Sequence, residues 1–282
     1  MTDRTKDKNK DSASQLCTFL RDSYLDRTSR PIYALAYLAL FIFLYEIGTI
    51  LISPAQLSEA LARPQIRVVA FVWVQNLLEL LGFSERLTWL ATPLVVVIIL
   101  VALQLTSRMR WAVSAKDFVP MTLECILLAV PLVVLSMLVN HSADSATLQA
   151  AGGYTAGTPR LLIDIITGIG AGIYEELVFR LILICLLMVL FQDFLGLSRM
   201  RSVVLSVLIS AVLFSAHHHI FFVNGSFGFG EVFTPGRFIF RALAGVYFAV
   251  LFAVRGFGIT AGTHAFYNII AAVVNAYLIE AG

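Results

Sequence analysis

Residues 161–190 have the sequence LLIDIITGIGAGIYEELVFRLILICLLMVL, an apolar stretch long enough to cross a bilayer. Two adjacent carboxylates, Glu175 and Glu176, lie in its middle, and Arg180 follows them. A charged side chain in hydrocarbon costs roughly 2.5–3.5 kcal/mol on insertion scales, so such residues normally face a bundle interior or a wet cavity. The stretch therefore predicts a membrane helix that carries part of a functional site.

The composition of the whole chain agrees with a membrane protein. Of its 282 residues, 59% are hydrophobic and 13% are charged, whereas a soluble domain has about 25% charged residues. The apolar segments are long and lack strict alternation, which predicts helices and not barrel strands. The net charge of +2 is too small to indicate a nucleic-acid partner. The three cysteines, Cys17, Cys125 and Cys185, match no metal-ligand or disulfide spacing.

We predict an all-α fold, a polytopic membrane helical bundle with seven transmembrane helices and one short helix. The seven ranges are 33–52, 88–105, 120–139, 161–190, 203–223, 238–254 and 259–279. The short helix, residues 68–83, could span the membrane, lie at its interface or re-enter it. Residues 1–31 are a polar N-terminal segment, in which residues 16–25 are expected to form a short surface helix.

Loop charges predict the orientation of these helices. Lys and Arg cluster in the N-terminal segment and in the loops 108–116, 191–202 and 255–258, whereas the loops 141–158 and 224–236 have none. The positive-inside rule places the N-terminus and the basic loops in the cytoplasm, in the cell membrane if the source is prokaryotic. This arrangement works best if residues 68–83 do not cross completely.

The first polar group of the C-terminal half is Glu175, Glu176 and Arg180. Residues four apart share a helix face, so Arg180 can pair with Glu176, while Glu175 points about 100° away. We therefore expect Glu176 to be neutralised and Glu175 to be free as a base, although a structural salt bridge would use the same residues. Gly168 and Gly172, on the same helix, predict close helix packing.

The second polar group lies in FSAHHH, residues 214–219, where Phe214 and His218 share a face. Adjacent helical residues point in different directions, so three consecutive histidines are not expected to serve one site. We expect His217 and His219 to lie near the helix end or at the membrane interface. A metal site built from the three histidines together is therefore not expected.

The third polar group is His264 and Asn268, whose spacing puts an imidazole and a carboxamide on one helix face. Both can donate hydrogen bonds to an oxyanion, although a buried pair of this kind is also common as structural support. A hairpin turning near residue 197 would bring Glu176 and His218 to the same depth. His264 lies near the start of its helix and would be shallower, unless that helix is displaced along the membrane normal.

The three groups together, EExxxR, FxxxH and HxxxN in this order, resemble the CAAX protease and bacteriocin-processing (CPBP, or Abi) family. The resemblance covers residues 159–279 approximately. It divides the chain into the polar segment 1–31, the transmembrane helices 32–158 without a recognised motif, and a catalytic core, residues 159–282.

The resemblance implies an intramembrane endopeptidase that cleaves a membrane-associated peptide or protein tail. In this family Glu175 and His218 are expected to activate a water molecule, His264 and Asn268 to hold the oxyanion, and Glu176 and Arg180 to support the site. No cofactor is expected. Glu175, His218 and His264 could in principle hold zinc, but Asn268 suits an oxyanion better than a metal.

Two other functions remain open from the residues alone. A proton-coupled transporter would also use buried carboxylates and histidines, although the inverted repeat typical of transporters is not visible. A catalytically inactive membrane scaffold would keep the fold, although the intact motifs argue against it. Glu46, Asp164 and Arg241 also lie in apolar segments, and each could bind a substrate terminus or form a salt bridge.

Overall fold

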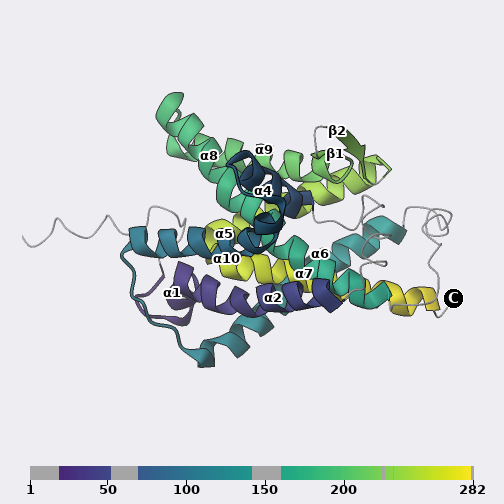
Figure 1. The fold of residues 1–282 in the computed structure, drawn as a ribbon, viewed down its shortest axis with the longest axis horizontal. Helices are drawn as coiled ribbons and strands as arrows, with labels where there is room; N and C mark the ends of the chain where they lie inside the picture. Colours follow the sequence, from purple (N-terminus) through teal and green to yellow (C-terminus); the bar gives the residue numbers. More distant parts are fainter. Residues whose placement is uncertain (1–18, 52–68, 142–159, 224–225, 231, 281–282) are drawn as a thin grey trace, which may run out of the picture.

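The computed structural model describes residues 19–51, 69–141, 160–223, 226–230 and 232–280. These residues form an all-α membrane helical bundle with one small β-hairpin at its periphery (Figure 1). The helices before the central stretch are α1 (Tyr24–Thr28), α2 (Pro31–Leu51), α4 (Val69–Leu80), α5 (Glu85–Ser107), the short η1 (Ala115–Asp117) and α6 (Phe118–His141). The later elements are α7 (Arg160–Glu176), η4 (Leu177–Leu183), α8 (Ile184–Met188), η5 (Val189–Phe194), α9 (Arg199–His217), β1 (Ile220–Val223), β2 (Ser226–Phe229) and α10 (Pro235–Glu280).

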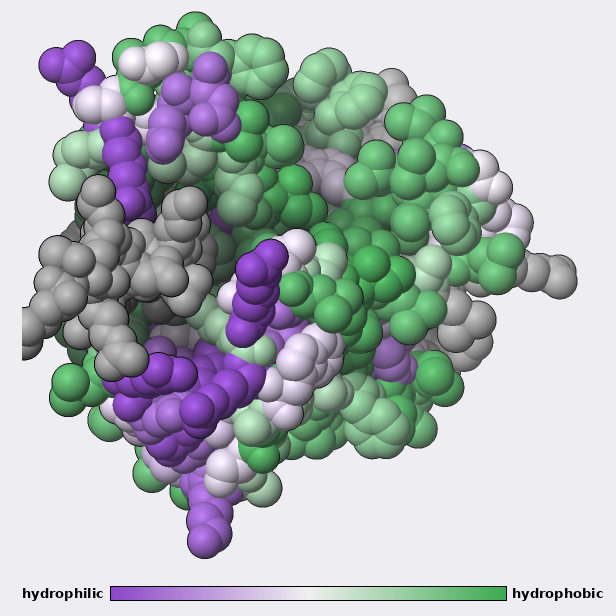
Figure 2. Space-filling view, turned by 90° about the vertical axis from the view of Figure 1, so that its left-hand side faces the viewer, coloured by the Kyte–Doolittle hydropathy of each residue, from purple (hydrophilic) through white to green (hydrophobic). Residues whose placement is uncertain are grey.

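Helix lengths agree with a multi-pass membrane protein. Within the described ranges, five helices are long and apolar enough to cross a membrane. Each of the seven predicted spans falls on a helix, and two of them share α10. The twelve residues of α4 extend about 18 Å, too short for a hydrocarbon core of about 30 Å. Large hydrophobic side chains cover broad areas of the outer surface, as Figure 2 shows for one end of the bundle.

A continuous helical segment of four elements, α7, η4, α8 and η5, carries the two glutamates. It runs from Arg160 to Phe194 and includes two π-helical turns, the first of which begins directly after Glu176. A π-helical turn is frequent at functional sites. The carbonyl of Phe179, within the first of these turns, accepts a hydrogen bond of 2.8 Å from Ser210 Oγ of α9. The α9 helix is thereby held beside the turn that follows the glutamates.

The α10 helix is broken at Gly256, whose φ of 76° and ψ of −179° are not helical. Glycine is required there because this combination of angles is nearly closed to other residues. Arg255, beside the break, is buried and donates to Glu124 Oε1 and Oε2 of α6 at 2.6 and 2.8 Å. It also donates to Thr28, Ser29 and the carbonyl of Leu25 in and around α1. The break separates the two predicted spans 238–254 and 259–279 and is fixed in place by these contacts.

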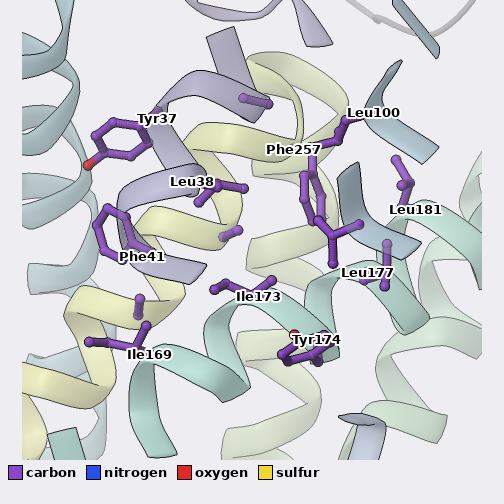
Figure 3. Packing of buried hydrophobic residues seen from close by; sticks show 14 of the residues in the cluster. Tyr37, Leu38, Phe41, Leu100, Ile169, Ile173, Tyr174, Leu177, Leu181 and Phe257 are labelled. Carbon is purple, nitrogen blue, oxygen red and sulfur yellow. The ribbon is translucent and has the colours of Figure 1, made fainter. Parts of the chain in front are cut away.

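The core lies where α7 packs against α2, α4 and α10 (Figure 3). Small residues allow the close approach of α7 and α10. A Cβ atom on Gly172 would lie 2.6 Å from Ala265 N, and one on Gly168 would lie 2.8 Å from Asn268 Cβ. The prediction of close packing at these two glycines is confirmed.

Two local predictions were wrong. The predicted span 203–223 ends early: α9 stops at His217, and β1 pairs antiparallel with β2, with Ile220 opposite Phe229 and Val223 opposite Ser226. The strands are rich in Phe and Val, which strand geometry accommodates as well as a membrane helix does. The surface helix expected at 16–25 instead occupies Tyr24–Thr28, where Ser23 Oγ accepts from the amide of Asp26 at the helix start.

Candidate active site

Glu176 and Arg180 form a fully buried ion pair one turn apart. Arg180 Nε lies 3.1 Å from Glu176 Oε2, at ion-pair distance but without hydrogen-bond alignment. The guanidinium also donates to the carbonyl of Gly245 at 3.3 Å and lies over the ring of Phe214, 4.1 Å from its centroid. A buried charge must be paired, because leaving one partner alone costs several kcal/mol. The pairing predicted for Glu176 and Arg180 is thus present.

His264, from the second half of α10, contacts the same carboxylate from the other side. Its Nδ1 lies 2.7 Å from Glu176 Oε1, and its ring stacks on Phe248 at 4.5 Å. Because the carboxylate can only accept, Nδ1 carries the hydrogen and Nε2 faces Glu175 Oε2 at 3.8 Å. Of the two alternatives for His264, a shallow position or a displaced helix, this contact favours the second, since His264 follows the break at Gly256 and reaches Glu176.

Two imidazoles lie at the C-terminal end of α9. His217 is the last residue of the helix and His218 follows it as the cap. The amide of His218 bonds to the carbonyl of Ser215 and not to that of Phe214, as a regular α-helix would require. The carbonyl of Phe214 is therefore available to side chains, and Nδ1 of His217 and Nδ1 of His218 lie 2.5 and 2.8 Å from it.

These histidines converge on Glu175. Its carboxylate is buried, and Oε1 lies 3.6 Å from His217 Nε2 while Oε2 lies 4.0 Å from His218 Nε2. The prediction that Glu176 and His218 lie at the same depth agrees with this geometry. Arg241 lies within electrostatic range of both Glu175 and His218. The arrangement concentrates proton acceptors, from three helices, around one carboxylate.

His217 is a site residue that sequence reasoning missed. We expected it near the helix end or at the membrane interface and did not assign it to the site. It is the last residue of α9, but it is buried and lies closer to Glu175 than His218 does. Adjacent residues of a regular helix point about 100° apart. His217 and His218 depart from this, because the helix ends there and both rings turn toward the carbonyl of Phe214. Their ring centroids are 4.0 Å apart. The signal in the sequence was the run of histidines followed by the strand-forming residues of β1.

Asn268 lies one turn beyond His264 on the same face of α10. Its Nδ2 donates to the carbonyl of Gly168 at 3.2 Å, two turns before Glu175 on α7. The carboxamide therefore joins α7 to α10. Its second N–H takes no part in this hydrogen bond. The structure places Asn268 at the edge of the polar group, and not in contact with Glu175 as His264 is.

One group among the described residues could hold a metal ion. The ligand atoms of Glu175, His217 and His218 all lie within 4.8 Å of one another. This set differs from the one expected for zinc, because His217 takes the place of His264. Tetrahedral ligands about 2.0–2.1 Å from zinc are about 3.3 Å apart, so the three side chains would have to move inward to bind it.

Glu46 of α2 lies outside this group. It is partly buried, and its Oε1 has no hydrogen-bond partner among the described residues. Its neighbour in the chain, Tyr45, packs against Tyr174 with ring centroids 5.7 Å apart. Glu46 is thus a second intramembrane carboxylate, on a helix that packs against α7 and apart from the histidines.

The fold and the site define a polytopic membrane protein with a buried carboxylate–imidazole centre. Residues 157–270 match the model of the family described as type II CAAX prenyl endopeptidase Rce1-like. The family is one of CAAX-type proteases, so the resemblance expected from the three motifs is confirmed. No match was found among the curated proteins or among the solved structures.

Proposed function

We propose that the protein is an intramembrane endopeptidase in which Glu175 and His218 activate water and His264 and Asn268 stabilise the oxyanion. The observation that carries the proposal is the unequal environment of the two glutamates. Glu176 is paired with Arg180 and His264, whereas Glu175 faces imidazole nitrogens at 3.6–4.0 Å. A carboxylate placed in this way is a general base, because it is held by its surroundings without being neutralised by a direct ion pair.

The separations around Glu175 suit a water molecule between the acceptors. Contacts longer than 3.5 Å between polar groups often contain a bridging water. One water that donates to two acceptors at about 2.8 Å holds them about 4.5 Å apart, and the observed separations approach this value. A water bound to Glu175 and His218 would have its oxygen lone pair free to attack a carbonyl carbon.

The position of His264 supports an oxyanion role. Glu176 accepts from its Nδ1 at 2.7 Å, so an oxyanion role uses a hydrogen on the other ring nitrogen, Nε2. The Nε2–H then donates to the oxyanion of the tetrahedral intermediate, and the second N–H of Asn268 adds to this support. Glu176 and Arg180 hold the ring in place.

The substrate we propose is a peptide or protein tail anchored in the lipid bilayer, such as the prenylated C-terminal tail that the family description names. The surrounding helices expose large hydrophobic side chains, which suits a lipid-anchored substrate and not a nucleic acid. We place the N-terminus and the opening of the site on the cytoplasmic side, because the basic loops gather there.

The first prediction concerns Glu175. Purified protein in detergent is incubated with a library of membrane-anchored peptides, and products are identified by mass spectrometry. Glu175→Gln and His218→Ala are each expected to abolish cleavage while the thermal unfolding midpoint stays close to that of the wild type. Loss of the base removes the proton acceptor that makes water nucleophilic.

Glu46→Gln is the matched control, because it makes the same change in another membrane helix outside the histidine group, and it is expected to keep the rate. Undiminished turnover in Glu175→Gln would show that this carboxylate is not the base. Chelator treatment with elemental analysis is run in parallel. Retained activity of metal-free protein supports the glutamate mechanism, and activity that returns only with added zinc contradicts it.

A further inference from the structure

We infer that His217 is a catalytic residue that accepts the second proton of the attacking water, beside Glu175, which accepts the first. The inference rests on the proposed function. It goes beyond that function because the FxxxH motif names only His218. The starting observation is geometric: His217 Nε2 lies 3.6 Å from Glu175 Oε1, whereas His218 Nε2 lies 4.0 Å from Oε2.

The hydrogen bond at the other side of the ring fixes its tautomer. His217 Nδ1 lies 2.5 Å from the carbonyl oxygen of Phe214, which has no hydrogen to give. Nδ1 therefore carries the hydrogen in the neutral ring, and Nε2 presents a lone pair toward Glu175. His217 Nε2 is thus a second acceptor beside the carboxylate that receives the first proton, 3.6 Å from Glu175 Oε1.

Aromatic packing keeps the ring in this orientation. His217 lies 4.7 Å from the ring centroid of Phe179 and 5.4 Å from that of Phe214. Trp73 of α4 packs at 5.9 Å and is itself held by its hydrogen bond of 2.8 Å to the carbonyl of Phe222. A base whose rotation is restricted on several sides is ready for proton transfer without reorganisation.

Peptide hydrolysis releases two protons from the attacking water, and the proposal assigns the second to His217. When the water oxygen bonds to the carbonyl carbon, one proton passes to Glu175. As the tetrahedral intermediate collapses, the C–N bond breaks and Glu175 returns its proton to the leaving nitrogen. The remaining hydroxyl proton passes to His217 Nε2 and then to the amine. The products are a carboxylate and an ammonium group, and both protons of the water are accounted for.

The two adjacent histidines thereby divide their roles. His217 is buried, whereas the side chain of His218 is 17% exposed. His218 lies on the more accessible side, where it orients the water with Glu175. His217 lies behind it and takes the proton that is released later.

The second prediction tests His217 with a substitution that separates packing from chemistry. In His217→Asn the amide N–H can still donate to the Phe214 carbonyl, but no acceptor remains at the position of Nε2. We expect kcat to fall about 10²- to 10⁴-fold, the usual contribution of a general acid or base, with KM and the thermal midpoint unchanged. Free imidazole is expected to restore part of the kcat of His217→Ala, because it can enter the space left by the ring.

His219→Asn is the matched control. This neighbouring imidazole is also buried but packs on Phe233 and Phe238, and its variant is expected to keep the wild-type kcat. Wild-type kcat in His217→Asn would overturn the inference and leave Glu175 and His218 as the water-activating pair. A lower kcat that is accompanied by a lower thermal unfolding midpoint, and that added imidazole does not restore, would also overturn it. Full activity in Glu175→Gln would instead refute the proposed function.

Discussion

Glu175 and Glu176 are neighbours in the chain, yet the helix gives them different surroundings. Glu176 points toward Arg180 and His264, while Glu175 points toward the end of α9. Arg180 lies 3.1 Å from Glu176 Oε2, whereas Glu175 faces imidazole nitrogens at 3.6–4.0 Å. This difference is the reason why we propose Glu175, and not Glu176, as the base.

The third prediction, also at the level of single residues, concerns Asn268. Its hydrogen bond to the Gly168 carbonyl means that the side chain could serve packing, oxyanion binding or both. We expect Asn268→Ala to lower kcat about 10²- to 10³-fold, the usual effect of losing one oxyanion donor, with little change in KM. Steady-state kinetics on the cleaved peptide measures this effect.

The thermal unfolding midpoint separates the two roles of Asn268. Loss of one hydrogen bond between helices in a membrane protein costs about 0.6 kcal/mol on average, so only a small decrease of the midpoint is expected. A large decrease of the midpoint with normal kcat per folded molecule would assign Asn268 to packing alone.

At the level of elements, the break in α10 controls where His264 lies. An unbroken helix would carry His264 past the glutamates, because each residue advances the chain about 1.5 Å along the axis. Gly256 allows the chain to turn, and Arg255 fixes the turn through α1 and α6. The N-terminal helices, which contain no recognised motif, thus position a residue of the active site.

The fourth prediction tests this turn. In Gly256→Ala a Cβ would lie 3.0 Å from the carbonyl oxygen of Ser29, in a backbone conformation that alanine rarely adopts. We expect a destabilisation of about 1–3 kcal/mol, seen as a lower unfolding midpoint, and a lower kcat because His264 is displaced. Gly236→Ala is the control, since its Cβ would meet only Val139 at 3.8 Å. Wild-type stability and rate in Gly256→Ala would refute the positioning role of the break.

At the level of the whole molecule, the outer surface and the loops suit a membrane. Exposed hydrophobic side chains occur on α2, α5 and α6, among them Phe43, Ile98 and Leu127. In water such a surface would promote aggregation, whereas in a bilayer it contacts lipid.

The fifth prediction is the orientation itself. A protease-cleavable tag at the N-terminus is expected to be cut from the cytoplasmic face, in inverted vesicles and not in intact cells, because Lys and Arg in short loops stay on that face. A tag inserted in the loop 224–236, which lacks Lys and Arg, should show the opposite accessibility. Cleavage of the N-terminal tag in intact cells would reverse the proposed topology.

Much of the bundle followed from local properties of the chain. Long apolar runs need internal hydrogen bonds in lipid, which favours helices, although the end of the run 203–223 forms β1. The four-residue spacings of Glu176 with Arg180 and of His264 with Asn268 fix shared faces within each helix. These features depend on neighbours in the chain, and for that reason composition and periodicity were sufficient to predict them.

The arrangement of the site depended instead on contacts between distant segments. His217 entered it because α9 ends against a β-hairpin and frees the carbonyl of Phe214. His264 reached Glu176 because α1 and α6 fix the break at Gly256. Neither helix ending is encoded by hydrophobic periodicity, since each is stabilised by partners far away in the chain. Apolar runs therefore specify which segments enter the membrane, while packing between those segments sets the depth and direction of the chemical groups.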